Sequence, residues 1–298
     1  MKLKTLELQK IYKEGEEFLR DAEIEEASID AWLLLEFVTG ISRAKYLCDP
    51  NMEISEKDVL RYCELMERRA KHIPLQHLTG EQEFMGYTFK VNEHVLIPRQ
   101  DTEVLVEEAM KFLRPGKSVL DMCTGSGCIL LSLLKMGAEK FYMRNVKGTA
   151  VDISEEALKV ASLNAKKLGV EVEFIQSDLF ENIDVNVTGK FDILVSNPPY
   201  IRTSVIEGLQ EEVRLHDPFI ALDGKEDGLY FYRKIVESSK DYLNNKAMIL
   251  FEIGHDQGED VSNLLKEAGF SNVWVKKDLA GLDRVVIAMY NIDNCEHK

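Results

Sequence analysis

Asn197-Pro198-Pro199-Tyr200 places several groups that can bind a polar ligand at a fixed spacing. The preceding apolar and β-branched run, residues 191–196, predicts a buried strand. The two prolines end this strand because neither can donate a backbone hydrogen bond. The result is a stiff corner that carries one amide side chain, two free carbonyls and an aromatic ring. Ligands bind at the carboxyl edge of open α/β sheets, although a proline turn that only ends a strand could have the same sequence.

Three other polar segments follow predicted strands upstream of this corner. Cys123-Thr124-Gly125-Ser126-Gly127 is a small-residue loop between a strand over 118–122 and a helix that begins at Cys128. Its glycines allow the backbone to approach a ligand closely. Asp152 ends the next strand, where a carboxylate can accept hydrogen bonds from ribose hydroxyls. Asp178 and Leu179 follow the third strand, where an adenine ring would lie against the apolar side chain.

The composition of the glycine loop distinguishes between two classes of adenosine ligand. A dinucleotide site prefers the pattern Gly-x-Gly-x-x-Gly, which binds a pyrophosphate, whereas this loop reads Cys-x-Gly-x-Gly. Asp121 stands directly before the loop, and its carboxylate would repel a phosphate but attract an ammonium group. An adenosine that carries an amino-acid group fits better, and we therefore expect S-adenosylmethionine as the cofactor.

The order of the predicted elements indicates three segments. Residues 1–78 are predicted to form a helical bundle, with Ser42 and Ser55 as helix caps. Residues 79–98 contain an alternating pattern around Gly86 that predicts a β-hairpin linker. Residues 99–298 alternate between strand and helix, as in a mostly parallel α/β sheet. We also expect a helix over 227–243 and a final antiparallel hairpin. The Tyr230-Phe231-Tyr232 run of this helix is expected to lie in the protein core.

Bulk composition excludes several classes of protein. The chain has 298 residues, 45% of them hydrophobic, and a net charge of −15, which disfavours a basic nucleic-acid-binding or membrane-surface protein. We therefore expect a cytoplasmic monomer that binds neither a membrane nor nucleic acid directly. No Cys-x-x-Cys pair exists, so we expect no metal site. The cysteines are Cys48, Cys63, Cys123, Cys128 and Cys295.

Several motifs together resemble one family of enzymes. Residues 119–129 resemble the first motif of Class I methyltransferases. With Ile97-Pro98-Arg99-Gln100-Asp101-Thr102-Glu103, the Asn-Pro-Pro-Tyr corner and Asp223-Gly224-x-x-Asp227-Gly228-Leu229, the chain is similar to the HemK/PrmC family. The family implies a Rossmann-like sheet of seven strands behind a small helical bundle, which would dock the partner. Its members are protein-(glutamine-N5) methyltransferases of peptide chain release factors.

The resemblance implies a function and roles for the site residues. A methyl group would pass from S-adenosylmethionine to the side-chain nitrogen of the glutamine in the Gly-Gly-Gln loop of class-1 release factors. The Asn197 side-chain oxygen and the Pro198 carbonyl would each accept an N–H of that amide, which has two hydrogens to donate. Tyr200 would pack on the planar amide, with Pro199 bracing the corner. Arg99 and Glu103 are expected to frame either the glutamine pocket or the linker hinge.

Two positions depart from the family pattern. Cys123 stands where many methyltransferases have a glycine, so we expect its backbone to avoid positive φ. Leu179 stands where some members carry tryptophan, so we expect weaker stacking on the adenine.

Three other functions remain open from the sequence. An adenine-N6 nucleic-acid methyltransferase shares the Asn-Pro-Pro-Tyr motif but needs a basic recognition surface. A glutamine methyltransferase of a ribosomal protein would use the same pocket chemistry. A non-catalytic adenosine-binding protein would not need the intact motif.

Overall fold

The computed structural model describes residues 1, 3 and 5–292, and so Cys295 lies outside it. Its described residues divide into two compact units. The first unit contains residues 1–81 and a short later segment, residues 210–216, and the second contains the rest. No helix among the described residues is long and apolar enough to cross a membrane.

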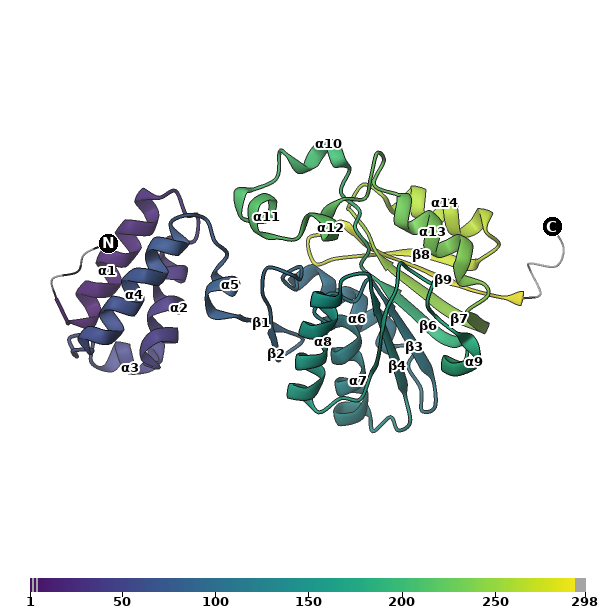
Figure 1. Ribbon diagram of the computed structural model, residues 1–298, viewed down its shortest axis with the longest axis horizontal. Helices are drawn as coiled ribbons and strands as arrows, with labels where there is room; N and C mark the ends of the chain where they lie inside the picture. The colour runs from purple at the N-terminus through teal and green to yellow at the C-terminus, as the bar shows by residue number, and fades with distance from the viewer. Residues whose placement is uncertain (2, 4, 293–298) are drawn as a thin grey trace. The chain divides into compact units, whose positions relative to one another are not determined.

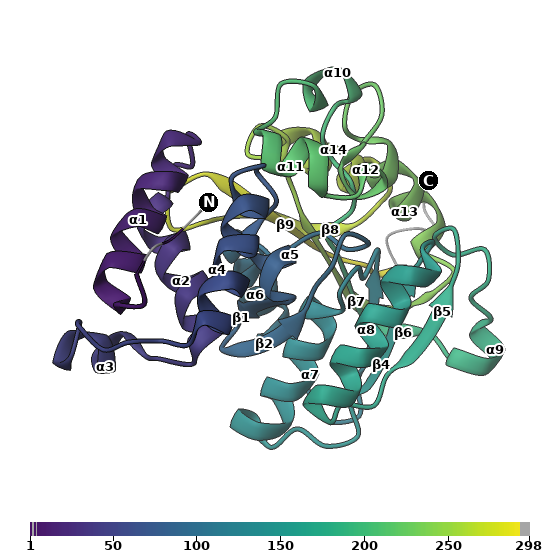
Figure 2. The same ribbon diagram turned by 60° about the vertical axis from the view of Figure 1, so that its left-hand side comes forward.

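The first unit is a helical bundle in which α1, α2 and α4 lie side by side (Figure 2). The hydroxyl of Tyr62 on α4 donates to the Ala31 carbonyl of α2. Gly15 on α1 makes room for this ring, because an added β-carbon would lie 2.0 Å from the Tyr62 hydroxyl. Ser42 and Ser55 accept backbone hydrogen bonds as helix caps, which confirms both predictions. The helices of this unit are α1 (Leu8–Asp21), α2 (Ala27–Thr39), α3 (Arg43–Cys48), α4 (Glu56–Arg69), α5 (Leu75–Thr79) and α11 (Glu211–His216).

A buried arginine joins the later segment of this unit to the bundle. The Arg69 guanidinium donates to Asp30 of α2 at 2.6 Å and also pairs with Glu212 of α11. Burial raises the pKa of the Asp30 carboxyl, and the hydrogen bond from Arg69 opposes this rise. Removing one partner of the buried Arg69–Asp30 pair would leave an uncompensated charge. The pair between Arg69 and Glu212 holds α11 on the bundle.

Within the described residues, the second unit contains one sheet of seven strands in the order β5-β4-β3-β6-β7-β9-β8. Strands β3, β4, β5, β6 and β7 run parallel to one another, and β9 is antiparallel to both β7 and β8. This topology confirms the mostly parallel sheet with a final antiparallel hairpin. The strands are β3 (Ser118–Met122), β4 (Lys147–Asp152), β5 (Glu173–Gln176), β6 (Phe191–Ser196), β7 (Leu243–Glu252), β8 (Ser271–Lys277) and β9 (Asp283–Met289).

Helices cover both faces of this sheet, as expected for parallel strands that are buried on both sides (Figure 1). α6 (Glu103–Met110), α7 (Cys128–Phe141) and α8 (Glu155–Leu168) lie on one face, and α13 (Tyr230–Ser239) and α14 (Gly258–Glu267) lie on the other. Each face has its own apolar core. The remaining short helices are η1 (Gln100–Thr102), α9 (Val185–Thr188), α10 (Thr203–Ile206) and α12 (Phe219–Leu222).

The predicted hairpin is present as β1 (Glu81–Phe84) and β2 (Tyr87–Lys90). Its two turn residues, Met85 and Gly86, both have positive φ, as a tight hairpin turn requires. The Met85 backbone N–H donates to the Glu103 carboxylate at 2.6 Å, which ties the turn to the start of α6.

The helix predicted over 227–243 is shorter in the structure, where α13 spans Tyr230–Ser239. Gly228 has a φ of +76°, which no right-handed helix contains, so the helix cannot begin before it. Leu243 instead begins β7, where its buried side chain joins the core. The prediction was wrong at both ends because the apolar pattern of a helix and of a fully buried strand overlap.

Candidate active site

A cavity of about 310 Å³ lies at the carboxyl ends of the parallel strands of the second unit. A volume of this size is within the range of small-molecule sites. The predicted residues that line it come from four separate loops and from the residue that follows the linker. They are Arg99, Cys123, Thr124, Gly125, Ser126, Asp152, Asp178, Leu179, Asn197 and Pro199.

Four predicted site residues do not line this cavity. They are Asp121, Gly127, Pro198 and Tyr200. Gly127 lies at the start of α7, where a β-carbon would meet Leu131 at 2.9 Å and Ala161 at 3.2 Å. Its lack of a side chain therefore serves packing between α7 and α8, with a φ of +80°.

The backbone of Cys123 differs from the expectation. Its φ is +63°, in the left-handed region that we expected a non-glycine residue to avoid. The prediction was wrong because the loop must turn sharply as it leaves β3, and a hydrogen bond from Thr124 N–H to the Val151 carbonyl holds that turn at 2.9 Å. A residue with a β-carbon costs about 1–2 kcal/mol in this conformation. Leu179 has a φ of +50° and Lys225 a φ of +70°, so three non-glycine residues that line the cavity carry backbone strain.

Asp121 is fully buried beneath the glycine loop and supports it from below. Its Oδ2 accepts a hydrogen bond from the Thr124 hydroxyl at 2.6 Å, whereas Oδ1 has no hydrogen-bond partner among the described residues. Burial raises the pKa of this carboxyl to about 7, with a smaller contribution from Asp152, and the Thr124 hydroxyl opposes the rise. A direct contact between Asp121 and an ammonium group stays a prediction.

This raised pKa makes the stability of the unit depend on pH. The folded protein holds the Asp121 proton more tightly than the unfolded chain does. The resulting stabilisation of the folded state is complete below about pH 4 and is lost as the pH rises to about 7. We expect Asp121→Asn to remove that loss. In urea unfolding without ligand, its free energy of unfolding relative to the wild type should increase by about 2–3 kcal/mol between pH 5 and pH 8.

Asp260→Asn, on the exposed side of α14, is the control and should keep the pH dependence of the wild type. If the free energies of unfolding of Asp121→Asn and the wild type changed with pH in the same way, Asp121 would not be protonated in the folded protein.

Asp152 connects the end of β4 to the glycine loop. Its Oδ1 accepts from Ser154 N–H at 2.9 Å and its Oδ2 accepts from Gly125 N–H at 2.8 Å. Burial raises the pKa of this carboxyl, and these backbone hydrogen bonds oppose the rise. Each carboxylate oxygen can accept a second hydrogen bond, so Asp152 retains capacity for hydroxyl groups of a ligand.

The chain that follows the proline corner is held by a second backbone segment. Ile201 N–H donates to the Leu222 carbonyl at 3.0 Å, and Gly224 N–H donates back to the Ile201 carbonyl at 2.8 Å. Between them, the Tyr200 carbonyl accepts from the Gln257 side-chain amide at 3.1 Å. Gly224 belongs to the Asp-Gly motif singled out in the sequence, and its missing side chain leaves room for the Tyr200 backbone, which a β-carbon would approach to 2.7 Å.

Arg99 joins the end of the linker to the segment after the corner. Its guanidinium donates to the buried Asp217 carboxylate at 2.8 Å, and its side chain is about half exposed. Pro218 and Ile220, which follow Asp217, line the cavity beside it. The ion pair thereby fixes one wall of the cavity.

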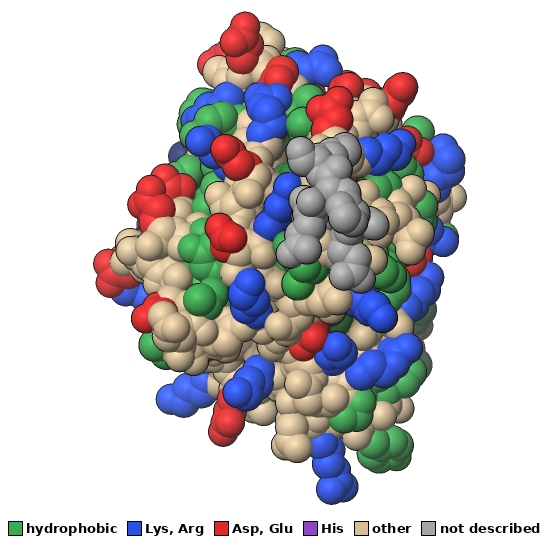
Figure 3. All heavy atoms as spheres, turned by 90° about the vertical axis from the view of Figure 1, so that its right-hand side faces the viewer, with side chains coloured by type: hydrophobic (Ala, Val, Ile, Leu, Met, Phe, Trp, Pro, Cys, Tyr) green, Lys and Arg blue, Asp and Glu red, His purple; other side chains and the backbone are tan. Residues whose placement is uncertain are grey.

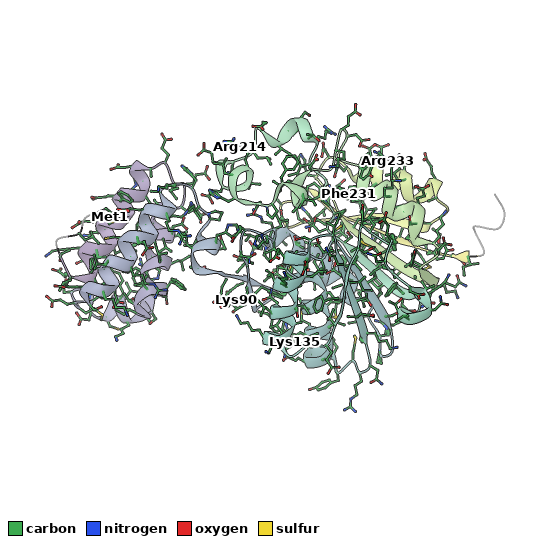
Figure 4. The ribbon with its side chains drawn as sticks, in the orientation of Figure 1. Met1, Lys90, Lys135, Arg214, Phe231 and Arg233 are labelled. Carbon is green, nitrogen blue, oxygen red and sulfur yellow. The ribbon has the colours of Figure 1, made fainter. Side chains whose placement is uncertain are left out.

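Asn164 belongs to no sequence motif, yet it joins three parts of the site. Its fully buried side chain accepts from Lys90 N–H at 2.7 Å and donates to the Lys90 carbonyl at 3.0 Å and the Ser126 carbonyl at 2.9 Å. Lys90 is labelled on β2 in Figure 4. Asn164 therefore holds the hairpin and the glycine loop at fixed positions on α8.

We expect Asn164→Ala to destabilise the protein by about 3 kcal/mol, because one buried and two part-buried backbone groups lose their partner. Urea unfolding measures this loss. Asn186→Ala is the matched control, because Asn186 is exposed and bonds only to nearby Asp184. An Asn164 variant as stable as the control would contradict the role of this side chain.

Tyr230 and Phe231 were predicted to lie in the core, but both line the cavity. Only Tyr232 of this run is fully buried, and its hydroxyl donates to the Glu252 carbonyl at 2.8 Å. Phe231 is labelled in Figure 4 on α13, near the carboxyl ends of the strands. The prediction was wrong because α13 begins at Tyr230, so its first residues face the strand ends rather than the sheet.

Other cavity residues carried no sequence signal of their own. They are His94, Val95, Leu96, Ile153, Ser177, Ala221 and Lys225. Most of them lie within a few residues of a motif that the sequence did identify.

Comparison with known proteins gives matches over most of the chain. The model of the PrmC N-terminal domain matches residues 10–80, and that of the methyltransferase small domain matches residues 100–221. A release factor glutamine methyltransferase from Clostridium acetobutylicum is 40% identical over 264 residues, which cover 87% of this chain and 90% of that protein. One from Caulobacter vibrioides is 38% identical, over 96% of this chain and 98% of that protein.

A solved structure agrees with the fold of the second unit. The 16S rRNA N2 G1207 methyltransferase of T. thermophilus, in complex with AdoMet and guanosine, aligns with a TM-score of 0.50. It is 17% identical and covers 71% of this chain and 50% of that chain. At this identity the likeness shows the fold alone, which is the Class I methyltransferase fold expected from the motifs.

Proposed function

Because this chain belongs to the family of release factor glutamine methyltransferases, we propose that it methylates the side-chain nitrogen, N5, of the glutamine in the Gly-Gly-Gln loop of class-1 release factors. S-adenosylmethionine is the methyl donor. The observation that carries the proposal is the position of Asn197, which lines the same cavity as Asp152 and Leu179. An amide-binding group and a nucleoside-binding group therefore meet in one cavity.

The residues of the cavity fit S-adenosylmethionine. Asp152 has hydrogen-bonding capacity left for the ribose hydroxyls, and Leu179 offers an apolar surface for the adenine beside Asp178. The loop Cys123-Thr124-Gly125-Ser126 would bind the amino-acid end, with Asp121 and its unpaired Oδ1 below. When bound, this cofactor supplies a methyl group on a sulfonium, which is already an electrophile.

The chain's own contribution is to hold the glutamine amide in place. An amide nitrogen is a poor nucleophile because its lone pair is delocalised into the carbonyl. The Asn197 side-chain oxygen, which lines the cavity, would accept one N–H and fix the nitrogen. Pro198 and Tyr200 do not line the cavity, so acceptance of the second N–H by the Pro198 carbonyl and packing of Tyr200 on the amide plane stay predictions. The nitrogen forms its bond to the methyl carbon as the carbon–sulfur bond breaks, and one amide proton then leaves to water. Positioning of this kind can contribute about 7–11 kcal/mol.

The proposed roles of the other segments follow from this substrate. Arg99 would frame the glutamine pocket, and residues 1–78 would dock the release factor. Release factors act in translation, so the proposal also includes the cytoplasm as the compartment. The monomeric state stays a prediction.

The test uses the full chain and cofactor with a labelled methyl group. We expect label on a purified class-1 release factor and none on a variant whose Gly-Gly-Gln glutamine is replaced by alanine. Purified ribosomal proteins are offered in parallel. Label on a ribosomal protein in place of the release factor would overturn the proposed substrate and support the alternative glutamine methyltransferase.

A nucleic-acid substrate is the remaining alternative. On the face of the molecule in Figure 3, Lys and Arg side chains are interspersed with Asp and Glu side chains. A net charge of −15 also opposes binding to phosphates. Tight binding of duplex DNA in a filter assay at low salt would favour an adenine-N6 methyltransferase instead.

A further inference from the structure

Glu252 is the last residue of β7 and lies next to the proline corner. In the parallel pairing of β6 and β7, Phe251 is the partner of Ser196, so Glu252 and Asn197 are the next residues on each strand. The Glu252 side chain is only 2% exposed and does not line the cavity. Its carboxyl is therefore buried next to the corner, outside the lining of the cavity.

Several groups face this carboxyl. The side chains of Thr102 and Asn197 lie near enough to favour its charged form, and its charged neighbours are Arg284 and Asp101. Burial raises the pKa of Glu252 to about 7, while Thr102, Arg284 and Asn197 oppose the rise. The Oε2 atom has no hydrogen-bond partner among the described residues. A buried acid with an unpaired oxygen is costly for a fold, which suggests a role beyond stability.

The chemistry of an amide side chain gives this contact a direction. Asn197 has one end that donates and one end that accepts, whereas a carboxylate only accepts. A hydrogen bond between Asn197 and the ionised Glu252 carboxylate must therefore come from the Asn197 NH₂ group. The Asn197 carbonyl oxygen then faces the opposite way, toward the cavity, which Asn197 lines.

We propose that Glu252 is a positioning residue that fixes the orientation of the Asn197 amide, so that its oxygen accepts from the substrate NH₂ group. This inference rests on the proposed function, because it needs a substrate that donates. Glu252 touches neither the substrate nor the cofactor, and it acts through Asn197 alone. In the reversed orientation Asn197 would present its own NH₂ group, and two donors would face each other.

Glu252→Gln tests the orientation with almost no change in shape. The glutamine side chain can either accept from the Asn197 NH₂ group or donate to the Asn197 oxygen, so it no longer fixes the amide in one orientation. We expect the rate of methyl transfer to release factor to fall about 10²-fold, as for a small misplacement of a reacting group. The dissociation constant of S-adenosylmethionine and the melting temperature should change little.

A double-mutant cycle with Asn197→Ala separates positioning from a general structural effect. If Glu252 acts through Asn197, adding Glu252→Gln to Asn197→Ala causes no further loss in single-turnover rate. If the two losses multiply, the inference is overturned. Glu108→Gln is the matched control, because Glu108 is a buried glutamate of α6 that pairs with Lys111. It should keep the wild-type rate.

A measurement on the wild type covers the case in which Glu252→Gln does not fold. In protein labelled with ¹⁵N-asparagine, the Asn197 side-chain hydrogens should exchange with water far more slowly than those of Asn244, which is partly exposed and whose hydrogen bond to the Lys190 carbonyl lies at the surface. Exchange as fast as that of Asn244 would overturn the inference. If the wild type does not methylate release factor, the proposed function fails instead, and this exchange measurement still tests the Asn197–Glu252 contact.

Discussion

Asn197→Ala should reduce methyl transfer to release factor by about 10²–10³-fold, the usual loss when one preorganised hydrogen-bonding group of an active site is removed. Its side chain lines the cavity, and its removal takes away an acceptor for the substrate amide. Affinity for S-adenosylmethionine should fall far less, because Asp152 and the glycine loop are intact. Single-turnover transfer measures the first quantity and calorimetric titration of the cofactor measures the second.

Asn244→Ala is the control for this experiment. Asn244 is partly exposed on β7, and its amide donates to the Lys190 carbonyl at 3.2 Å, at the opposite end of β6 from the corner. The control should transfer methyl groups at the wild-type rate. If Asn197→Ala does so too, the amide-binding role of the corner is wrong.

Gly228→Ala is expected to impair both stability and activity. Gly228 has a φ of +76°, and an added β-carbon would lie 2.4 Å from the Tyr200 carbonyl and 2.7 Å from the Gln257 amide nitrogen. The segment that holds the corner must therefore move. We expect a loss of about 10²-fold in methyl transfer, because small displacements of reacting groups have effects of this size. Overpacking should add about 1–3 kcal/mol of destabilisation to the backbone strain.

Gly169→Ala isolates the backbone strain. Gly169 follows α8 with a φ of +67°, and nothing lies within 4 Å of its added β-carbon. This variant should lose about 1–2 kcal/mol of stability and keep its turnover. Equal losses in the two variants would mean that contact with Tyr200 and Gln257 is unimportant.

Several sequence patterns determined local structure correctly because their physical cause is local. Ser42 and Ser55 cap helices with hydrogen bonds to the third residue on. Gly86 lies in the hairpin turn, where a positive φ is needed. The strand before the proline corner ends at Ser196, directly before the residues that cannot continue a ladder.

The predictions failed where contacts between distant parts of the chain set the local conformation. Cys123 takes a positive φ because the turn out of β3 is fixed by a hydrogen bond to β4. Phe231 lines the cavity because of where α13 begins. No pattern near Asn164 indicates that its amide joins a hairpin to the glycine loop, since its partners are up to 74 residues away.

The sequence by itself determined the family, the order of strands and helices, and the residues of each loop at the strand ends, because motif spacing and local turn chemistry are written along the chain. Only the tertiary structure decided which of these residues meet. Glu252 and Asn197 are far apart in the sequence, and they become neighbours only through the pairing of β6 with β7. The register of parallel strands depends on the whole packed sheet, and no local pattern specifies it.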